Sequence, residues 1–235
     1  MRIWDVDPGY LDRKRLLAEH QELHGLYNVV VLGKKGFANH PETMRWRPNL
    51  SALVARHACL VHEMILRGYR HQSPLDRVES PPVWPDGYID LPFQQFLLLE
   101  GKYAGKDVGR IPLPGNTQTL WAQNKYSVMA RQPNRVRLIG QAVAEGSIDF
   151  KALAAELVLV LRQIPREGHL VNALDHMWGY VSQWDKRPAK PSLLLALIGK
   201  LALANQITYL IHSTALGELA RFLENQPSDN AVNTL

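Results

Sequence analysis

Two groups near the start of the chain have types suited to amine chemistry. Met1 carries the α-amine, and α-amines have an ordinary pKa of roughly 7.7–8.0, far below that of a lysine. Such an amine can attack an electrophilic carbon without a large pKa shift. Arg2 follows Met1, and we expect Met1 to be retained because methionine aminopeptidase acts before small second residues. Glu22, on the first predicted helix, supplies a carboxylate that can exchange protons in such a reaction.

Histidines gather in the same part of the chain. His20 and His24 lie one helical turn apart with Glu22 between them, a spacing that can bind a metal but is not the His-Glu-x-x-His pattern of zinc proteases. Six of the nine histidines fall in the first third, namely His20, His24, His40, His57, His62 and His71. Three interpretations stay open: polar residues that face solvent, contacts to phosphates or bases, and a metal site.

Basic residues are interleaved with tryptophans over the first 47 residues. The basic set is Arg13, Lys14, Arg15, Lys34, Lys35, Arg45 and Arg47, and the tryptophans are Trp4 and Trp46. Such a set can bind phosphates and position a duplex, and the aromatic rings could fill the gap that a flipped nucleotide leaves. The alternative is a solvated charged face with tryptophans in the core.

Composition bounds the class of protein. The chain has 235 residues, 46% of them hydrophobic and 21% charged, which is enough for one large core or two modest ones. A net charge of +5 suits a polyanionic partner without establishing one. The single cysteine, Cys59, excludes an internal disulfide and a cysteine-based zinc cluster, and we expect it in the core. We predict a cytoplasmic protein, because no signal peptide is apparent and the most apolar stretch, 193–204, is too short to cross a membrane. We also predict that the protein uses no cofactor.

Apolar periodicity predicts an all-α fold. One helix should run from a cap at Asp7-Pro8 to a stop at Gly33, and a second from Asn49 to Gly68. Further helices fit 92–104, 116–131, 134–145, 149–164, 167–184, 191–204 and 213–225, with a frayed tail from Pro227. Five prolines within 73–92 mark an irregular connector. We expect two parts, a first domain over 1–110 that includes this connector and a helical domain over 111–235.

The second half has its own polar constellation. Asn172, His176 and Tyr180 recur at every fourth position and so share one helical face. Trp121, Lys125 and Tyr126 could meet that face across a helix pair, which makes these six residues a candidate site. The face is either a polar pocket or a buried hydrogen-bonded network, and we favour the network.

The beginning of the chain resembles the phage endonuclease V type of pyrimidine-dimer DNA glycosylase/AP lyase. The similar residues are Arg2-Ile3 and the run 16–23, Leu-Leu-Ala-Glu-His-Gln-Glu-Leu. Bacterial members that begin Met-Arg-(Ile/Leu)-Trp and carry Gly-(Tyr/Phe)-x-x-His-Pro are more similar still, and 36–41 here reads Gly-Phe-Ala-Asn-His-Pro. The resemblance covers about residues 1–75 and extends at most to 110. Gln21 and Gly25 stand where the phage enzyme has arginines.

This resemblance implies an activity and a set of roles. The amine of Met1 would attack the sugar C1′ of a damaged, ultraviolet-induced pyrimidine nucleotide, with Glu22 assisting and with damaged duplex DNA as the partner. The implied DNA contacts are Arg2, Arg15, His20, Gln21, His24, Lys34, Lys35, His40 and Arg45. Two other classes remain: a non-catalytic nucleic-acid-binding or adaptor protein that kept the fold, and a metal-dependent enzyme that uses the His20/His24 cluster.

The second half resembles a different family, the YbgA-like helical domain of unknown function. The residues that carry this resemblance are Leu120-Trp121, Lys125-Tyr126 and the run Val171-Asn172-x-x-x-His176-Met177-x-Gly179-Tyr180. It covers roughly 116–225 and implies a helical fold, with no activity attached.

Overall fold

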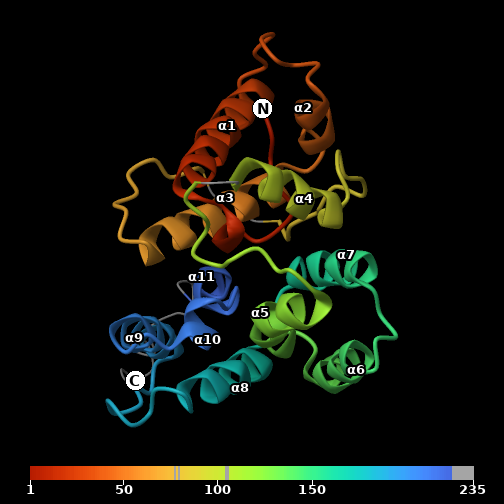
Figure 1. Ribbon diagram of the computed structural model, residues 1–235. Helices are drawn as coiled ribbons and strands as arrows, with labels where there is room; N and C mark the ends of the chain where they lie inside the picture. Colours follow the sequence, from red (N-terminus) through yellow and green to blue (C-terminus); the bar gives the residue numbers. More distant parts are fainter. Residues whose placement is uncertain (77, 79, 104–105, 224–235) are drawn as a thin grey trace, which may run out of the picture.

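The computed structural model is all-α, as the sequence predicts (Figure 1), and it describes residues 1–76, 78, 80–103 and 106–223. Over this range there are eleven α-helices and two 3₁₀ helices, with no strand. The first half contains η1 (Pro8–Tyr10), α1 (Arg13–Val31), α2 (Pro41–Trp46), α3 (Leu50–Leu66) and α4 (Pro92–Tyr103). The second half contains α5 (Thr117–Met129), α6 (Pro133–Ala144), α7 (Phe150–Leu161), α8 (Glu167–Trp178), α9 (Pro191–Ala204), α10 (Thr208–Ile211), α11 (Ala215–Glu218) and η2 (Ala220–Phe222).

The start of the first long helix differs from the prediction. Asp7 and Pro8 do form a cap, but it opens only the 3₁₀ turn η1, in which the Asp7 carboxylate accepts from the Gly9 N–H. The helix α1 begins five residues later, where the side chain of Asp12 accepts from the Arg15 N–H. Asp7 and Asp12 can each cap a helix. The longer run of apolar residues at helical spacing follows Asp12, so the long helix begins there. At the other end, Gly33 adopts φ +62°, so the predicted stop there is confirmed.

The segment between α1 and α3 contains a helix, α2, that was not predicted from the sequence. His40 occupies the N-cap of α2 and its ring Nδ1 accepts from the Glu42 N–H, with Pro41 at the first helical position. The helix α3 then follows Asn49 as predicted, although the Asn49 side chain donates back to the Arg45 carbonyl and does not cap. A helix of six residues is too short to show an apolar period, which explains the omission.

Two hydrophobic clusters form the interior, and α5 contributes to both. The first cluster joins α1, α3 and α4 to α5, α6 and α7, with Leu120 and Trp121 among its buried residues. The second joins Tyr126 and Met129 of α5 to α8, α9 and α11. Figure 1 shows α4 above α7 and α3 above α11, and both pairs are in contact. The apolar interior therefore continues across residue 110, and a two-domain division at 110/111 stays a prediction.

The last part of the chain is less regular than predicted. The helix expected over 167–184 ends at Trp178, and that over 213–225 is replaced by the short elements α11 and η2, which follow a further short helix, α10, that was not predicted. The ends of the helices predicted over 92–104 and 213–225, and the tail from Pro227, lie outside the described residues. Within the described part of the chain, no helix combines the length and apolar character needed to cross a bilayer.

Candidate active site

Residues 1–6 form an extended segment, which we call the arm. Its backbone N–H groups donate hydrogen bonds to side chains of the surrounding helices. The Arg2 N–H donates to Glu22 of α1 at 2.5 Å, and the Ile3 N–H to Glu42 of α2 at 3.2 Å. The next N–H, of Trp4, donates to Glu19 at 3.1 Å, and that of Asp5 to Gln95 of α4 at 2.8 Å. Four consecutive backbone donors thus have specific partners, and these partners fix the direction of the arm.

The α-amine lies beside the carboxylate that the sequence singled out. The Met1 nitrogen is 3.8 Å from Glu22 Oε1, while the other oxygen of Glu22 accepts from the Arg2 N–H. The Glu22 side chain is 38% exposed, so this end of the site is open to solvent. The structure therefore places Met1 and Glu22 together, with a carboxylate within reach of both the amine and an incoming molecule.

Buried ion pairs position the carboxylates that accept hydrogen bonds from the arm. Arg56 of α3 binds both oxygens of Glu19 at 2.8 and 2.9 Å, and its third nitrogen donates to the Val6 carbonyl. Arg45 pairs with Glu42 and with Asp5. The buried residues Glu19, Glu42 and Arg56 were not predicted as site residues. A signal existed, because Glu19 falls in helical register with Leu16, Leu23 and Leu26, where an apolar residue is expected.

The second half of the chain also contacts the arm. Arg162, which follows α7, donates to Asp5 at 2.6 Å. Farther along, Arg110 binds Glu63 of α3 at 2.7 Å and donates to the Ser213 carbonyl at 3.1 Å. Ion pairs and hydrogen bonds therefore connect the part that carries the amine to the part that follows α4.

Six of the nine residues predicted to contact DNA fall into two groups, and the other three are the histidines His20, His24 and His40. Arg2 pairs with Asp90 at 2.6 Å and lies over the Trp4 ring, Arg15 pairs with Asp12, and Arg45 is held as described. These three guanidinium groups already have carboxylate partners. The exposed members are Gln21, Lys34 and Lys35. DNA contact by any member of the set stays a prediction.

The expectation that Trp4 and Trp46 could fill the gap left by a flipped nucleotide is wrong. Trp4 is 4% exposed and Trp46 is fully buried, and the Trp46 ring N–H donates to Glu42. The exposed aromatic of this region is Phe37, at 73% exposure, in the loop between Lys35 and His40. Its φ of +59° is rare for a residue with a side chain. An exposed phenylalanine beside two lysines is the kind of side chain that inserts between bases.

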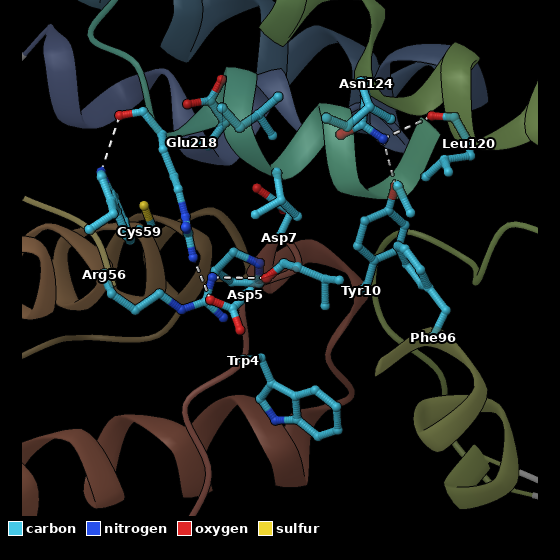
Figure 2. A pocket seen from close by; sticks show the side chains of 18 of the residues that line it. Trp4, Asp5, Asp7, Tyr10, Arg56, Cys59, Phe96, Leu120, Asn124 and Glu218 are labelled. Carbon is cyan, nitrogen blue, oxygen red and sulfur yellow. Dashed lines mark hydrogen bonds and ion pairs between the residues drawn. The ribbon is translucent and has the colours of Figure 1, made fainter. Parts of the chain in front are cut away.

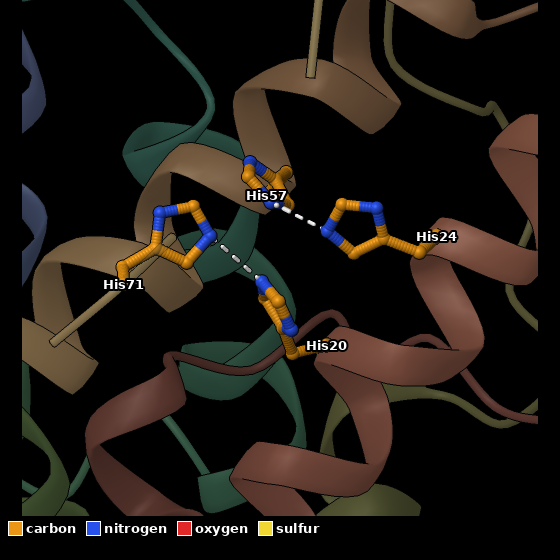
Figure 3. Close-up of side chains that lie close together, drawn as sticks. All are labelled: His20, His24, His57 and His71. Atoms are coloured by element: carbon orange, nitrogen blue, oxygen red, sulfur yellow. Dashed lines mark hydrogen bonds between the residues drawn. The ribbon is translucent and has the colours of Figure 1, made fainter. Parts of the chain in front are cut away.

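Four histidines meet on the other side of α1 (Figure 3). His20 and His24 of α1, His57 of α3 and His71 of the following segment each offer a ring nitrogen, and these nitrogens all lie within 4.8 Å of one another. The Nε2 atoms of His20 and His71 are 3.1 Å apart, as are those of His24 and His57. Burial and the neighbouring imidazoles lower the pKa of His20 to about 4 and that of His57 to about 3. These rings are therefore neutral at pH 7. The sequence analysis named all four among the six histidines of the first third, but it did not single out these four.

A small cavity lies where the arm meets both halves of the chain (Figure 2). Its volume is about 60 Å³, and it is lined by Trp4, Asp7, Arg56, Cys59 and Glu218 among others. Burial, with the nearby charge of Glu63, raises the pKa of Asp7 to about 7. Cys59 is buried, as predicted, and burial raises the pKa of its thiol. We regard this cavity as part of the packing around the arm.

The candidate site of the second half is not a buried network. Asn172, His176 and Tyr180 are exposed, while Trp121 and Tyr126 are buried in different hydrophobic clusters. Lys125 lies beside Tyr126, its ammonium 5.8 Å from the ring centroid. Tyr126 and Tyr180 do share a side-chain hydrogen bond, and both contact Tyr209, which stacks on Tyr180 and meets Tyr126 edge-on. The favoured interpretation was wrong for Asn172 and His176, because α8 turns its Leu170, Ala173, Leu174 and Met177 inward instead.

Comparison with known families divides the chain in the same way as the motifs. Residues 1–77 match a family model described as pyrimidine dimer DNA glycosylase. Residues 125–226 match a second model, described as a protein of unknown function (DUF1722), the YbgA-like family. The chain joins a glycosylase-like part to a YbgA-like part. No curated protein and no solved structure matches the chain. The first match includes Met1, Glu22 and the four clustered histidines, and it indicates a glycosylase-like function that involves DNA.

Proposed function

We propose that the protein is a DNA glycosylase/AP lyase that uses the α-amine of Met1 as its nucleophile. The observation that carries this proposal is the position of Glu22, 3.8 Å from the amine and bonded to the next N–H, within the segment that resembles pyrimidine dimer DNA glycosylases. An amine held by four successive backbone contacts is already oriented, so little entropy is lost when it attacks.

The proposed reaction follows from these two groups. The nitrogen lone pair of Met1 attacks the sugar C1′, the bond from C1′ to the base breaks, and the base leaves with the bonding electrons and takes up a proton. Opening of the sugar ring then gives an imine between Met1 and C1′. Glu22 is the group that moves protons during ring opening. The imine makes the C2′ proton acidic, and its loss expels the 3′ phosphate and cuts the strand.

Surface chemistry supports a nucleic-acid substrate. Lys34 and Lys35 are exposed near the end of α1, and Phe37 projects from the same loop. Lysines bind phosphates without regard to sequence, and an apolar side chain can occupy the space of an extruded nucleotide. Together with the match to pyrimidine dimer DNA glycosylases, these side chains support damaged duplex DNA with ultraviolet-induced pyrimidine lesions as the proposed substrate.

Reductive trapping tests the proposal. The full-length protein is incubated with abasic-site duplex and sodium borohydride, and the adduct is digested and mapped by mass spectrometry. We expect the modified peptide to begin at Met1, which also establishes where the mature chain starts. Selective blocking of the α-amine should abolish the adduct, whereas a mock-treated sample should keep it. An adduct on a lysine would overturn the assignment of Met1.

A second arm of the same experiment tests the lesion. Duplexes that carry a cyclobutane thymine dimer, an abasic site or no damage are compared under identical conditions. The proposed glycosylase step predicts trapping on the first two and none on the third. Trapping on the abasic duplex alone would leave a lyase without dimer specificity. Binding without any trapping would favour the non-catalytic nucleic-acid-binding class.

A further inference from the structure

The histidine cluster contains four side chains from three separate segments. Two belong to successive turns of α1, one to α3, and one to the segment after α3. Gly68, at φ +82°, turns the chain at the end of α3, and His71 comes back to its neighbours three residues later. Figure 3 shows the four rings arranged around a shared space. Nothing in the proposed lyase chemistry requires this convergence.

The dimensions of the cluster are close to those of a metal site. A zinc ion binds histidine nitrogens at about 2.0–2.1 Å, so a tetrahedral site separates its ligand atoms by about 3.4 Å. Here two pairs of Nε2 atoms lie 3.1 Å apart, and the widest separation among the four ligand atoms is at most 4.8 Å. Small side-chain rotations would bring all four nitrogens to the tetrahedral spacing.

The chemistry of the donors narrows the type of ion. All four donors are imidazoles, which suit zinc, cobalt, nickel and copper and do not suit magnesium or calcium. Without a metal, the two imidazoles of each pair could hydrogen-bond to each other, and that arrangement uses one N–H per pair. It does not account for the approach of the two pairs to within 4.8 Å of each other.

We propose that His20, His24, His57 and His71 bind one zinc-like divalent transition metal in a closed structural site. Four protein ligands fill a tetrahedral shell and leave no position for a reacting water, which distinguishes a structural site from a catalytic one. The ion would fasten the His71 segment to α1 and α3. Glu22 is two residues from each α1 ligand, about 160° around the helix from them, so the ion lies on the opposite side of α1 from the amine.

Metal binding is measured on full-length protein without a histidine tag. The protein is stripped with a chelator, dialysed and titrated with zinc by calorimetry, and cobalt(II) is titrated in parallel. We expect one equivalent per chain, the visible d–d bands of tetrahedral cobalt, and a zinc-dependent rise in Tm. His71→Ala and His24→Ala each remove one of the four ligands, so each should weaken zinc binding by at least the about 10–100-fold that loss of an outer-shell partner typically costs.

A control variant outside the cluster and a check that every variant is folded complete this test. His169→Gln changes a half-buried histidine whose partner is the Arg131 carbonyl, and it should bind zinc like wild type. Circular dichroism checks that all variants are folded. If His71→Ala or His24→Ala, folded, binds zinc as tightly as wild type, the ion does not use this cluster and the proposal fails. Absence of stoichiometric binding by the wild type would also overturn it.

The outcome is independent of the proposed lyase. Chelated protein should still form the borohydride adduct with abasic-site DNA, because the metal is assigned no part in that reaction. If removing the metal abolishes trapping while the protein stays folded, the structural role is wrong and a metal-dependent enzyme is favoured. Failure of trapping in both metal-loaded and chelated protein would concern the lyase alone.

Discussion

The two sides of α1 satisfy their polar groups in different ways. On one side, Glu19 and Glu22 receive N–H donors from the arm, and Arg56 neutralises the more deeply buried carboxylate. On the other side, His20 and His24 face further histidines, so ring nitrogen meets ring nitrogen. On the first side, protein groups of opposite charge or hydrogen-bonding type face each other, and their contacts orient the amine that we propose as the nucleophile. On the second side, ring nitrogens face one another, and we propose a cation as their shared partner.

The largest expected effect tests the carboxylate side directly. Glu22→Gln keeps the size of the side chain but removes its charge and its ability to exchange a proton. General acid–base groups contribute typically about 10²–10⁴-fold, so lyase turnover should fall by that factor while DNA binding changes little. Turnover is measured on abasic-site duplex. Glu167→Gln, at an exposed helical position, is the control, and equal rates for both variants would remove Glu22 from the mechanism.

The next largest expected effect concerns the ion pair between Arg56 and Glu19. Arg56→Met leaves Glu19 buried without its bidentate partner. Breaking a buried pair by removing one member typically lowers the free energy of unfolding by about 3–5 kcal/mol. Urea denaturation measures the change. Arg187→Met removes an exposed partner of Asp175 and should change stability by about 0–1 kcal/mol. Comparable losses in the two variants would mean that burial does not set the strength of the Arg56 pair.

A smaller effect should appear as a pH dependence at the end of the arm. The folded-state pKa of Asp7 is raised from 3.8 to about 7, so between these values the folded protein holds a proton that the unfolded chain has lost. Stability from this group is therefore present at low pH and is lost as pH rises toward 7. The stability of Asp7→Asn relative to wild type should therefore be higher at pH 8 than at pH 4, by up to about 4 kcal/mol for a pKa shift of this size. A difference that is the same at both pH values would contradict the raised pKa.

The smallest expected effect concerns Lys34, an exposed lysine just after the end of α1. Lys34 has no carboxylate partner among the described ion pairs, in contrast to Arg2 and Arg45. If it contacts a phosphate, Lys34→Ala should reduce the slope of log K against log salt by about 0.9. Fluorescence anisotropy with damaged and undamaged duplex gives that slope. Lys186→Ala, an exposed lysine of the second half, should leave it unchanged. An unaltered slope for Lys34→Ala places this residue outside the DNA footprint.

Local patterns predicted the elements better than they predicted the sites. The all-α class and the ends of the long helices at Gly33 and Gly68 follow from periodicity and from glycine at a left-handed position. Met1 and Glu22 were named for their chemistry and through the family resemblance, and their proximity was expected. His57 and His71 were named among six histidines but were not grouped with His20 and His24, because they join His24 and His20 across 33 and 51 residues through packing alone. The exposure of Asn172 and His176 was misjudged because a shared helical face does not say which way it turns.

The bond between Arg162 and Asp5 has a consequence for the order in which the molecule is completed. It joins residues 157 positions apart, so Asp5 lacks this partner until Arg162 has been synthesised. At about 5–20 residues per second, translation takes on the order of 8–30 s to cover that distance. The arm leaves the ribosome before α7, so Asp5 acquires its ion pair with Arg162 only after α7 has been made. A nascent chain that stops before α7 therefore carries the amine without the full set of contacts that aim it.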